Sequence, residues 1–324
     1  LKPGNTRSLA LVLYLVVAFF IYRFILDPGV IGVEAYNPAQ TGNMGGLGLN
    51  SIVAWPVGAV LAAAAAWVIG KIALGLREDY LSIATLGIAE IIVTVMRNED
   101  WLDRGVKNLI DFPRPWPVPK EVDLQLDPAF LEPIAAMGLD PVTASTIFVK
   151  LLYATMFGLV LVLLVWGCER ALNSPWGRMV RAIRDNEISS AAMGKDVKFR
   201  HLQIFIIGSA VVGLAGAMMT SMEGQLTPPS YLPLRFTFLI WVMVIVGGSG
   251  NNWGSILGGL LIGWLYLAVE FLGPQMMEIL TSGMPAGWLK DHLQDSAAQM
   301  RLLTLGVVLL LVLRFAPKGL IPEK

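Results

Sequence analysis

Eight stretches of mostly apolar residues constrain this chain more than any other feature of its sequence. A helix that crosses a bilayer needs about 20 such residues. Hydrophobic residues make up 55% of the 324 residues and charged residues only 15%, whereas a soluble domain carries roughly 25% charged residues. We therefore predict an all-α polytopic membrane protein, with a single transmembrane domain over residues 1–324 and about eight helices. The stretches lie near residues 9–26, 52–74, 80–97, 145–168, 202–222, 234–250, 254–272 and 301–315.

Composition excludes several classes of function. The lone Cys168 cannot form an intramolecular disulfide, and His201 and His292 are too few and too far apart for a metal site. A net charge of zero leaves no basic footprint for nucleic acid. Ser, His and acidic residues do not cluster at the spacing of a nucleophile elbow or a zinc protease. We expect no metal, no cofactor, no nucleic-acid partner and no catalytic residue.

The distribution of charged residues predicts how the chain is oriented in the membrane. Residues 169–200 hold seven Lys or Arg against four Asp or Glu, and short basic loops stay in the cytoplasm. Eight spans threaded from this loop place both termini inside and residues 98–144 outside. Four prolines between Asp111 and Lys120 favour extended backbone in that external loop. No small-residue cleavage site follows the first apolar stretch, so we expect that span to be retained.

The basic loop also predicts a short helix. Asp185 or Asn186 can cap it and Gly194 can end it, which gives a helix from Glu187 to Met193. One interpretation is a solvated loop that meets lipid phosphates, and the other is a docking helix that enters a groove on a cytoplasmic partner. The residues of this candidate docking site are Arg178, Arg181, Arg184, Asp185, Glu187, Ile188, Ala191, Ala192 and Gly194.

A glycine-rich turn joins two of the apolar stretches. It resembles a phosphate-binding loop only superficially, because both flanks are predicted membrane helices and no Walker A sequence is present. We expect it to allow a tight turn and close helix packing instead. The chain is therefore expected not to bind ATP itself. The glycines concerned are Gly247, Gly248, Gly250, Gly254 and Gly258.

Polar residues within the third apolar stretch indicate a possible solute path. An ionisable residue inside a span is by default a functional hypothesis, and Glu90 is such a residue. Ser82, Thr85 and Gly87 precede it. The alternative is that these groups serve helix packing, with Glu90 near the outer interface.

Four ordered motifs resemble the branched-chain amino acid permease family of ABC importers, specifically its M-type membrane subunit. They are the run from Asp79 to Gly87, the loop from Gly177 to Gly194, the glycine-rich turn, and the C-terminal Pro317 to Leu320. Residues 1–51 depart from the family pattern, since they contain one span where family members carry an Asn- and Gly-rich pair.

The resemblance implies a transport subunit of the bacterial inner membrane that works by alternating access. It also implies partners: a homologous second permease subunit, two cytoplasmic ATPase subunits that use the ATP, a periplasmic solute-binding protein, and membrane lipid. It favours the docking-helix interpretation. The alternatives are a permease of the same architecture for urea, short amides or another small polar solute, an ion-coupled secondary transporter that uses Glu90 or Glu270, and an enzyme acting on lipid.

Overall fold

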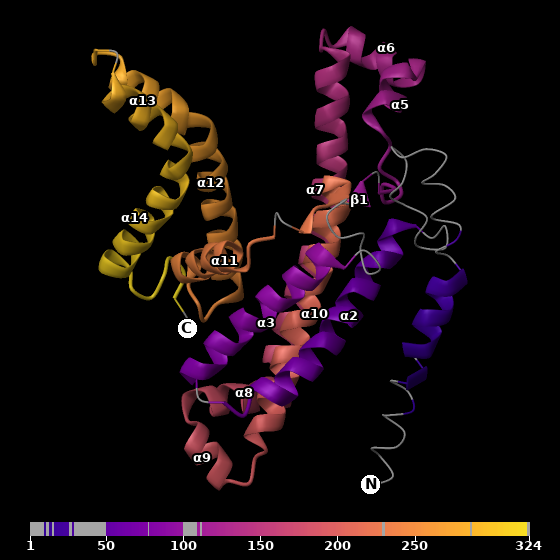
Figure 1. Ribbon diagram of the computed structural model, residues 1–324, viewed down its shortest axis with the longest axis vertical. Helices are drawn as coiled ribbons and strands as arrows, with labels where there is room; N and C mark the ends of the chain where they lie inside the picture. Colours follow the sequence, from indigo (N-terminus) through magenta and orange to yellow (C-terminus); the bar gives the residue numbers. More distant parts are fainter. Residues whose placement is uncertain are drawn as a thin grey trace. The chain divides into compact units, whose positions relative to one another are not determined.

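The computed structural model is mainly helical through the part of the chain that it describes, and its strands there are two of two residues each (Figure 1). The all-α class is therefore confirmed. The described residues are 10, 13–14, 16–25, 28, 50–76, 78–99, 109–110, 112–228, 231–285 and 287–322.

Five helices among the described residues are long and apolar enough to cross a membrane. They match five of the predicted stretches to within a few residues, except that α12 continues well past residue 272. These helices make the chain a multi-pass membrane protein. They are α2 (Ser51–Ala73), α3 (Glu78–Asn98), α7 (Pro141–Leu172), α10 (Val197–Glu223) and α12 (Asn252–Thr281).

The count of eight spans is not confirmed. Helix α11 (Pro233–Gly247) has 15 residues, about 22 Å of helix against a hydrocarbon core of about 30 Å. Helix α14 (Met300–Phe315) passes the test only together with α13 (Trp288–Asp295), across a bend of 69°. The described part of the first stretch contains a helix from Val16 to Ile25.

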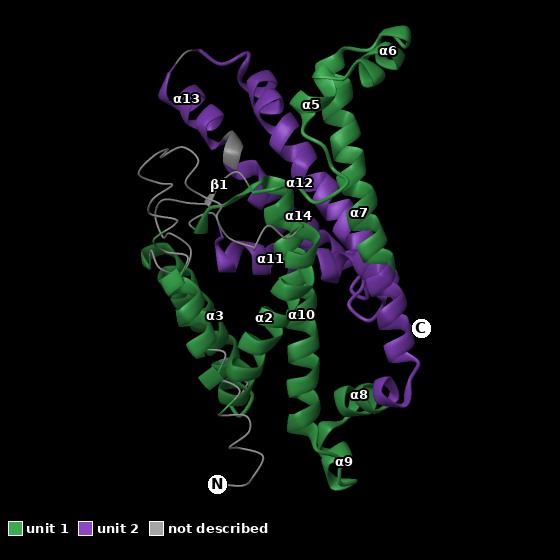
Figure 2. Cartoon of the chain, turned by 90° about the vertical axis from the view of Figure 1, so that its right-hand side faces the viewer, with its two compact units in different colours: residues 1–162, 179–230 green, residues 163–178, 231–324 purple. Residues whose placement is uncertain are grey.

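The chain divides into two compact units, residues 1–162 with 179–230 and residues 163–178 with 231–324 (Figure 2). In the first unit α2 and α10 pack closely through small residues. A Cβ atom on Gly213 would lie 2.3 Å from the Cβ of Ala62 and 2.9 Å from the carbonyl oxygen of Gly58. Only glycine at position 213 permits this approach, which is typical of helix packing in membranes.

Buried hydrogen bonds connect α2 and α7 to Ser221 of α10. The indole nitrogen of Trp55 donates to the hydroxyl of Ser221 at 3.0 Å, and the hydroxyl of Tyr153 donates to the carbonyl of Ser221 at 3.2 Å. The ring of Phe157 packs edge-on against Trp55. Trp55 is thus a core residue of the first unit.

The segment expected outside combines extended and helical structure. Its proline-rich run, residues 112–120, lacks regular secondary structure, as predicted. Strand β1 (Leu109–Ile110) pairs antiparallel with β2 (Gln225–Leu226). The helices α5 (Glu121–Leu126) and α6 (Pro128–Ala136) were not predicted. Arg114 pairs with Glu121 at 2.5 Å, which fastens the proline run to the start of α5.

The second unit has its core where α11, α12 and α14 meet. Val242, Val246, Ile262 and Leu305 are almost completely buried there. A Cβ on Gly258 would lie 1.9 Å from the carbonyl oxygen of Met243, so α11 and α12 touch backbone to backbone. Gly258 is one of the glycines for which close helix packing was predicted.

Candidate functional site

A hairpin of two short helices follows α7, and we call residues 174–194 the docking hairpin. Its first helix is α8 (Pro175–Asp185) and its second is α9 (Glu187–Ala192). The hydroxyl of Ser174 accepts from the Gly177 amide at 3.2 Å and Pro175 occupies the first helical position, which is a favoured helix start. The sequence predicted α9 to within one residue of its end.

Local capping fixes the geometry of α9. The side-chain oxygen of Asn186 accepts from the Ser189 amide at 2.8 Å, and Gly194 has a positive φ of 77°. The hydroxyl of the buried Ser190 donates to the carbonyl of Ala182 at 3.1 Å, which ties α9 back onto α8. An N-cap at Asp185 or Asn186 and an end at Gly194 were predicted, and Asn186 is the cap. The tie through Ser190 was missed, because a lone serine gives no sequence signal for a partner eight residues away.

The outer surface of the docking hairpin is uncovered. Ile188 is 84% exposed and Met193 is 78% exposed. Apolar side chains held outward on a capped helix form a surface that another protein can bury. The remaining predicted docking residues are also exposed: Arg178, Arg181, Arg184, Asp185, Glu187, Ala191, Ala192 and Gly194.

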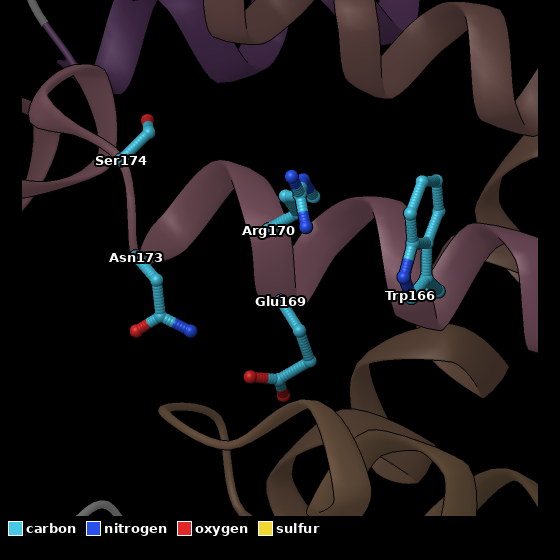
Figure 3. Close-up of a pocket in the computed structure, with 5 residues that line it drawn as sticks. All are labelled: Trp166, Glu169, Arg170, Asn173 and Ser174. Atoms are coloured by element: carbon cyan, nitrogen blue, oxygen red, sulfur yellow. The ribbon is translucent and has the colours of Figure 1, made fainter.

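The junction between α7 and α8 lies within the second unit and is tightly built. A Cβ on Gly177 would lie 2.4 Å from the carbonyl oxygens of Ala171 and Leu172, so this position requires glycine. A hollow of about 400 Å³ opens beside the junction (Figure 3). Its lining residues are Trp166, Glu169, Arg170, Asn173 and Ser174.

One side chain in this hollow connects α7 to α12. Figure 3 shows Glu169 pointing away from Arg170, and its carboxylate accepts from the side-chain amide of Asn252 at 3.1 Å. Asn252 is the first residue of α12. The helix end that leads into the docking hairpin is therefore bonded to the start of a membrane-spanning helix.

The predicted glycine-rich turn is tight. Gly248 ends α11 with a φ of 119°, and the turn continues through Gly250 into α12. The C-terminal motif packs directly on it, since Leu320 and Ile321 donate to the carbonyls of Val246 and Gly247 at 2.9 and 3.0 Å. Two motifs that were predicted separately thus form one structure.

The candidate path residues lie on α3. Ser82, Gly87 and Glu90 are exposed, and the Thr85 hydroxyl donates to the carbonyl of Leu81 at 2.9 Å. At 3.6 residues per turn the four positions spread over roughly 200° of the helix, so they do not form one narrow stripe. No residue in the apolar window of α3 is buried. That they line a solute path stays a prediction.

A charged cluster in the second unit was missed as a site. We call Arg235, Tyr266, Glu270 and Arg301 the arginine cluster. Arg301 pairs with Glu270 at 3.0 Å and donates to the Tyr266 hydroxyl at 3.4 Å, and Arg235 donates to the same hydroxyl. Glu270 was considered only as an isolated coupling carboxylate, because its partners are about 30 residues away in sequence.

The comparisons with known proteins agree with this architecture. The family model described as "Branched-chain amino acid transport system / permease component" matches residues 8–313. The chain belongs to this permease family. No solved structure matches the chain.

Curated relatives of this permease carry related names. The "Probable branched-chain amino acid transport permease protein LivM" of Methanocaldococcus jannaschii is 32% identical over 156 residues, 48% of this chain and 42% of that protein. The high-affinity LivM permease protein of Escherichia coli is 28% identical over 237 residues, 72% of this chain and 54% of its own. A ribose import permease protein of Haemophilus influenzae is 27% identical over 31% of this chain and 32% of its own. The chain spans about half the length of the LivM proteins it matches.

Proposed function

We propose that this permease is the membrane-spanning subunit of an ATP-driven importer that carries branched-chain or related amino acids across the bacterial inner membrane. The docking hairpin is the observation that carries the proposal. It combines rigid capping with outward apolar side chains, Ile188 and Met193, beside exposed arginines. A helix held in this way suits transmission of force from a soluble partner better than a loose basic loop does.

The contacts of the second unit supply a route for that force. The end of α7 leads covalently into the docking hairpin, and its Glu169 holds Asn252 at the start of α12. The neighbouring turn is bonded to the C-terminal motif. ATP binding and hydrolysis on the partner would pull on α7 and shift α12 between outward-open and inward-open states. The transported solute biases only those states that it binds differently.

The proposed partners follow from the surfaces left open and from the family. One of two ATPase subunits docks at this hairpin and the other on the second permease subunit, and both use the ATP, so this chain needs no cofactor and catalyses no reaction itself. A homologous permease subunit covers the exposed α3, whose apolar window buries none of its residues in this chain. A periplasmic solute-binding protein delivers the solute at the face that carries residues 98–144, and lipid surrounds the remaining apolar surface.

Reconstitution into proteoliposomes tests the proposal. The chain and its co-expressed partners should take up radiolabelled leucine, isoleucine or valine when ATP is enclosed with the ATPases and the binding protein is supplied on the opposite side. Urea, acetamide and ribose serve as comparison solutes. Uptake driven by an ion gradient without ATPase subunits would refute the importer, and uptake of urea without any amino acid would refute the substrate class.

A further inference from the structure

The arginine cluster lies where three helices of the second unit meet. Tyr266 is at the middle of α12, the membrane-spanning helix of this unit. Arg235 is in the first turn of α11 and Arg301 in the first turn of α14. The N-terminus of α11 and two guanidinium groups therefore meet beside the middle of one span. Helix N-termini carry partial positive charge and attract anions.

The surroundings of α12 change along its length. Gly254, Gly258, Ile262, Tyr266 and Glu270 recur at spacing four, so successive members lie about 40° apart and the series winds around about 160° of the helix. The first three are buried against the neighbouring helices. Tyr266 is half-buried and the Glu270 side chain is 52% exposed. The series thus runs from a dry packed core to a polar, accessible cluster.

The cluster holds an excess of positive charge. Both guanidinium groups also lie over the Tyr266 ring, with 5.8 Å from Arg235 and 5.3 Å from Arg301 to the ring centroid. Glu270 neutralises only one of the two arginines, and it is paired with Arg301. Charged side chains within spans are rare and mark solute pathways or pair with one another. Pairing explains Arg301 and Glu270 but leaves the charge of Arg235 unmatched within the cluster.

The Tyr266 hydroxyl shows which ligand the cluster suits. Its oxygen accepts from Arg235 and Arg301, so its own proton is available to donate. A tyrosine hydroxyl acts as donor and acceptor at once, while a guanidinium group only donates. A ligand that accepts from both Arg235 and Tyr266 has to offer two acceptor lone pairs, and the unmatched charge of Arg235 favours an anion. A carboxylate provides both, and arginine binds carboxylates in a fork geometry.

We propose that the arginine cluster binds the carboxylate of the transported solute during its passage, with Arg235 and Tyr266 as the contacting groups and Arg301 and Glu270 as positioning groups. This inference rests on the proposed import function. It adds a contact that selects solutes by their carboxylate after their release from the binding protein. Discontinuous or short helices whose N-termini face an anionic substrate group serve the same purpose in other transporters.

Thermal stabilisation of the purified complex of this chain with its partners, without binding protein, tests the proposal. The ligands are leucine, leucinamide, which lacks the carboxylate, and isocaproate, which lacks the amine. Leucine and isocaproate should stabilise the wild type and leucinamide should not. Arg235→Gln should weaken the leucine response about tenfold or more, and Arg235→Lys should restore part of it. Arg314→Gln, an exposed arginine at the other end of α14, is the matched control and should behave as wild type.

Three results would overturn the proposal. Equal stabilisation by leucinamide and leucine would exclude carboxylate recognition, and an unchanged response in Arg235→Gln would exclude this site. A response that depends on added phosphatidylglycerol rather than on leucine would assign the cluster to lipid headgroups. If the complex does not assemble with Arg235→Gln, Tyr266→Phe, which removes one hydroxyl, tests the site by the same stabilisation measurement. Leucine uptake by the wild type separates the import function from the carboxylate site. No uptake would refute the import function. Uptake together with an unchanged leucine response in Arg235→Gln would refute only the site.

Discussion

Replacement of Gly258 by alanine should separate α11 from α12. The added Cβ would lie 1.9 Å from the carbonyl oxygen of Met243, and Cβ atoms essentially never approach closer than 3.0 Å. The obstructing atom is backbone, so the helices must move apart by about 1 Å. Overpacking of this kind costs typically about 1–3 kcal/mol. The core formed by Val242, Val246 and Ile262 would lose packing at the same time.

The neighbouring residue supplies the control. A Cβ on Gly259 meets nothing within 4 Å, and alanine in an open helical position stabilises by roughly 0.5–1 kcal/mol relative to glycine. The two variants should therefore differ by about 2–4 kcal/mol. In detergent the apparent melting temperature of Gly258→Ala should be roughly 5–10 °C below that of Gly259→Ala. Equal melting temperatures would refute the backbone contact.

Two further perturbations address the first unit. Trp55→Phe removes the hydrogen bond to Ser221 and part of a buried ring and should destabilise the purified protein by about 2 kcal/mol, whereas Trp67→Phe, on an exposed part of α2, should leave the melting temperature unchanged. Burial alone would raise the pKa of Glu121, but its hydrogen bond and ion pair with Arg114 hold that pKa below 4.5. The stabilisation from this pair is therefore complete above pH 4.5 and is lost as the pH falls through the lowered pKa. Residues 112–140 should become protease-sensitive on acidification in the wild type, and Glu121→Gln should be sensitive at neutral pH and insensitive to acidification.

Local signals made much of this chain predictable. The helix α9 was predicted to within one residue because Asn186 and Gly194 act on their immediate neighbours. The five long helices were predicted from hydropathy because each one carries enough apolar residues by itself. Close packing at Gly258 was predicted from the spacing of small residues.

Contacts between distant residues were not predictable. Hydropathy counted the turn after Gly247 as part of a span, although the backbone leaves the helix there and α11 is too short to cross alone. The bonds from Leu320 to Val246 and from Asn252 to Glu169 join motifs that a single sequence shows only as separate runs. The arginine cluster was not predicted for the same reason, since its arginines belong to helices that meet only after folding.

The proposed role of the docking hairpin can be tested by one measurement, the amount of ATPase subunit that co-purifies with the permease. Ile188→Glu places a charge at the most exposed apolar position of α9. Loss of a central contact typically costs about 2 kcal/mol or more, which is roughly a thirtyfold weaker complex. Leu126→Glu, at 75% exposure on α5, is the matched control. We predict that the ATPases are lost from Ile188→Glu and retained by Leu126→Glu, and equal retention by both variants would contradict docking at this hairpin.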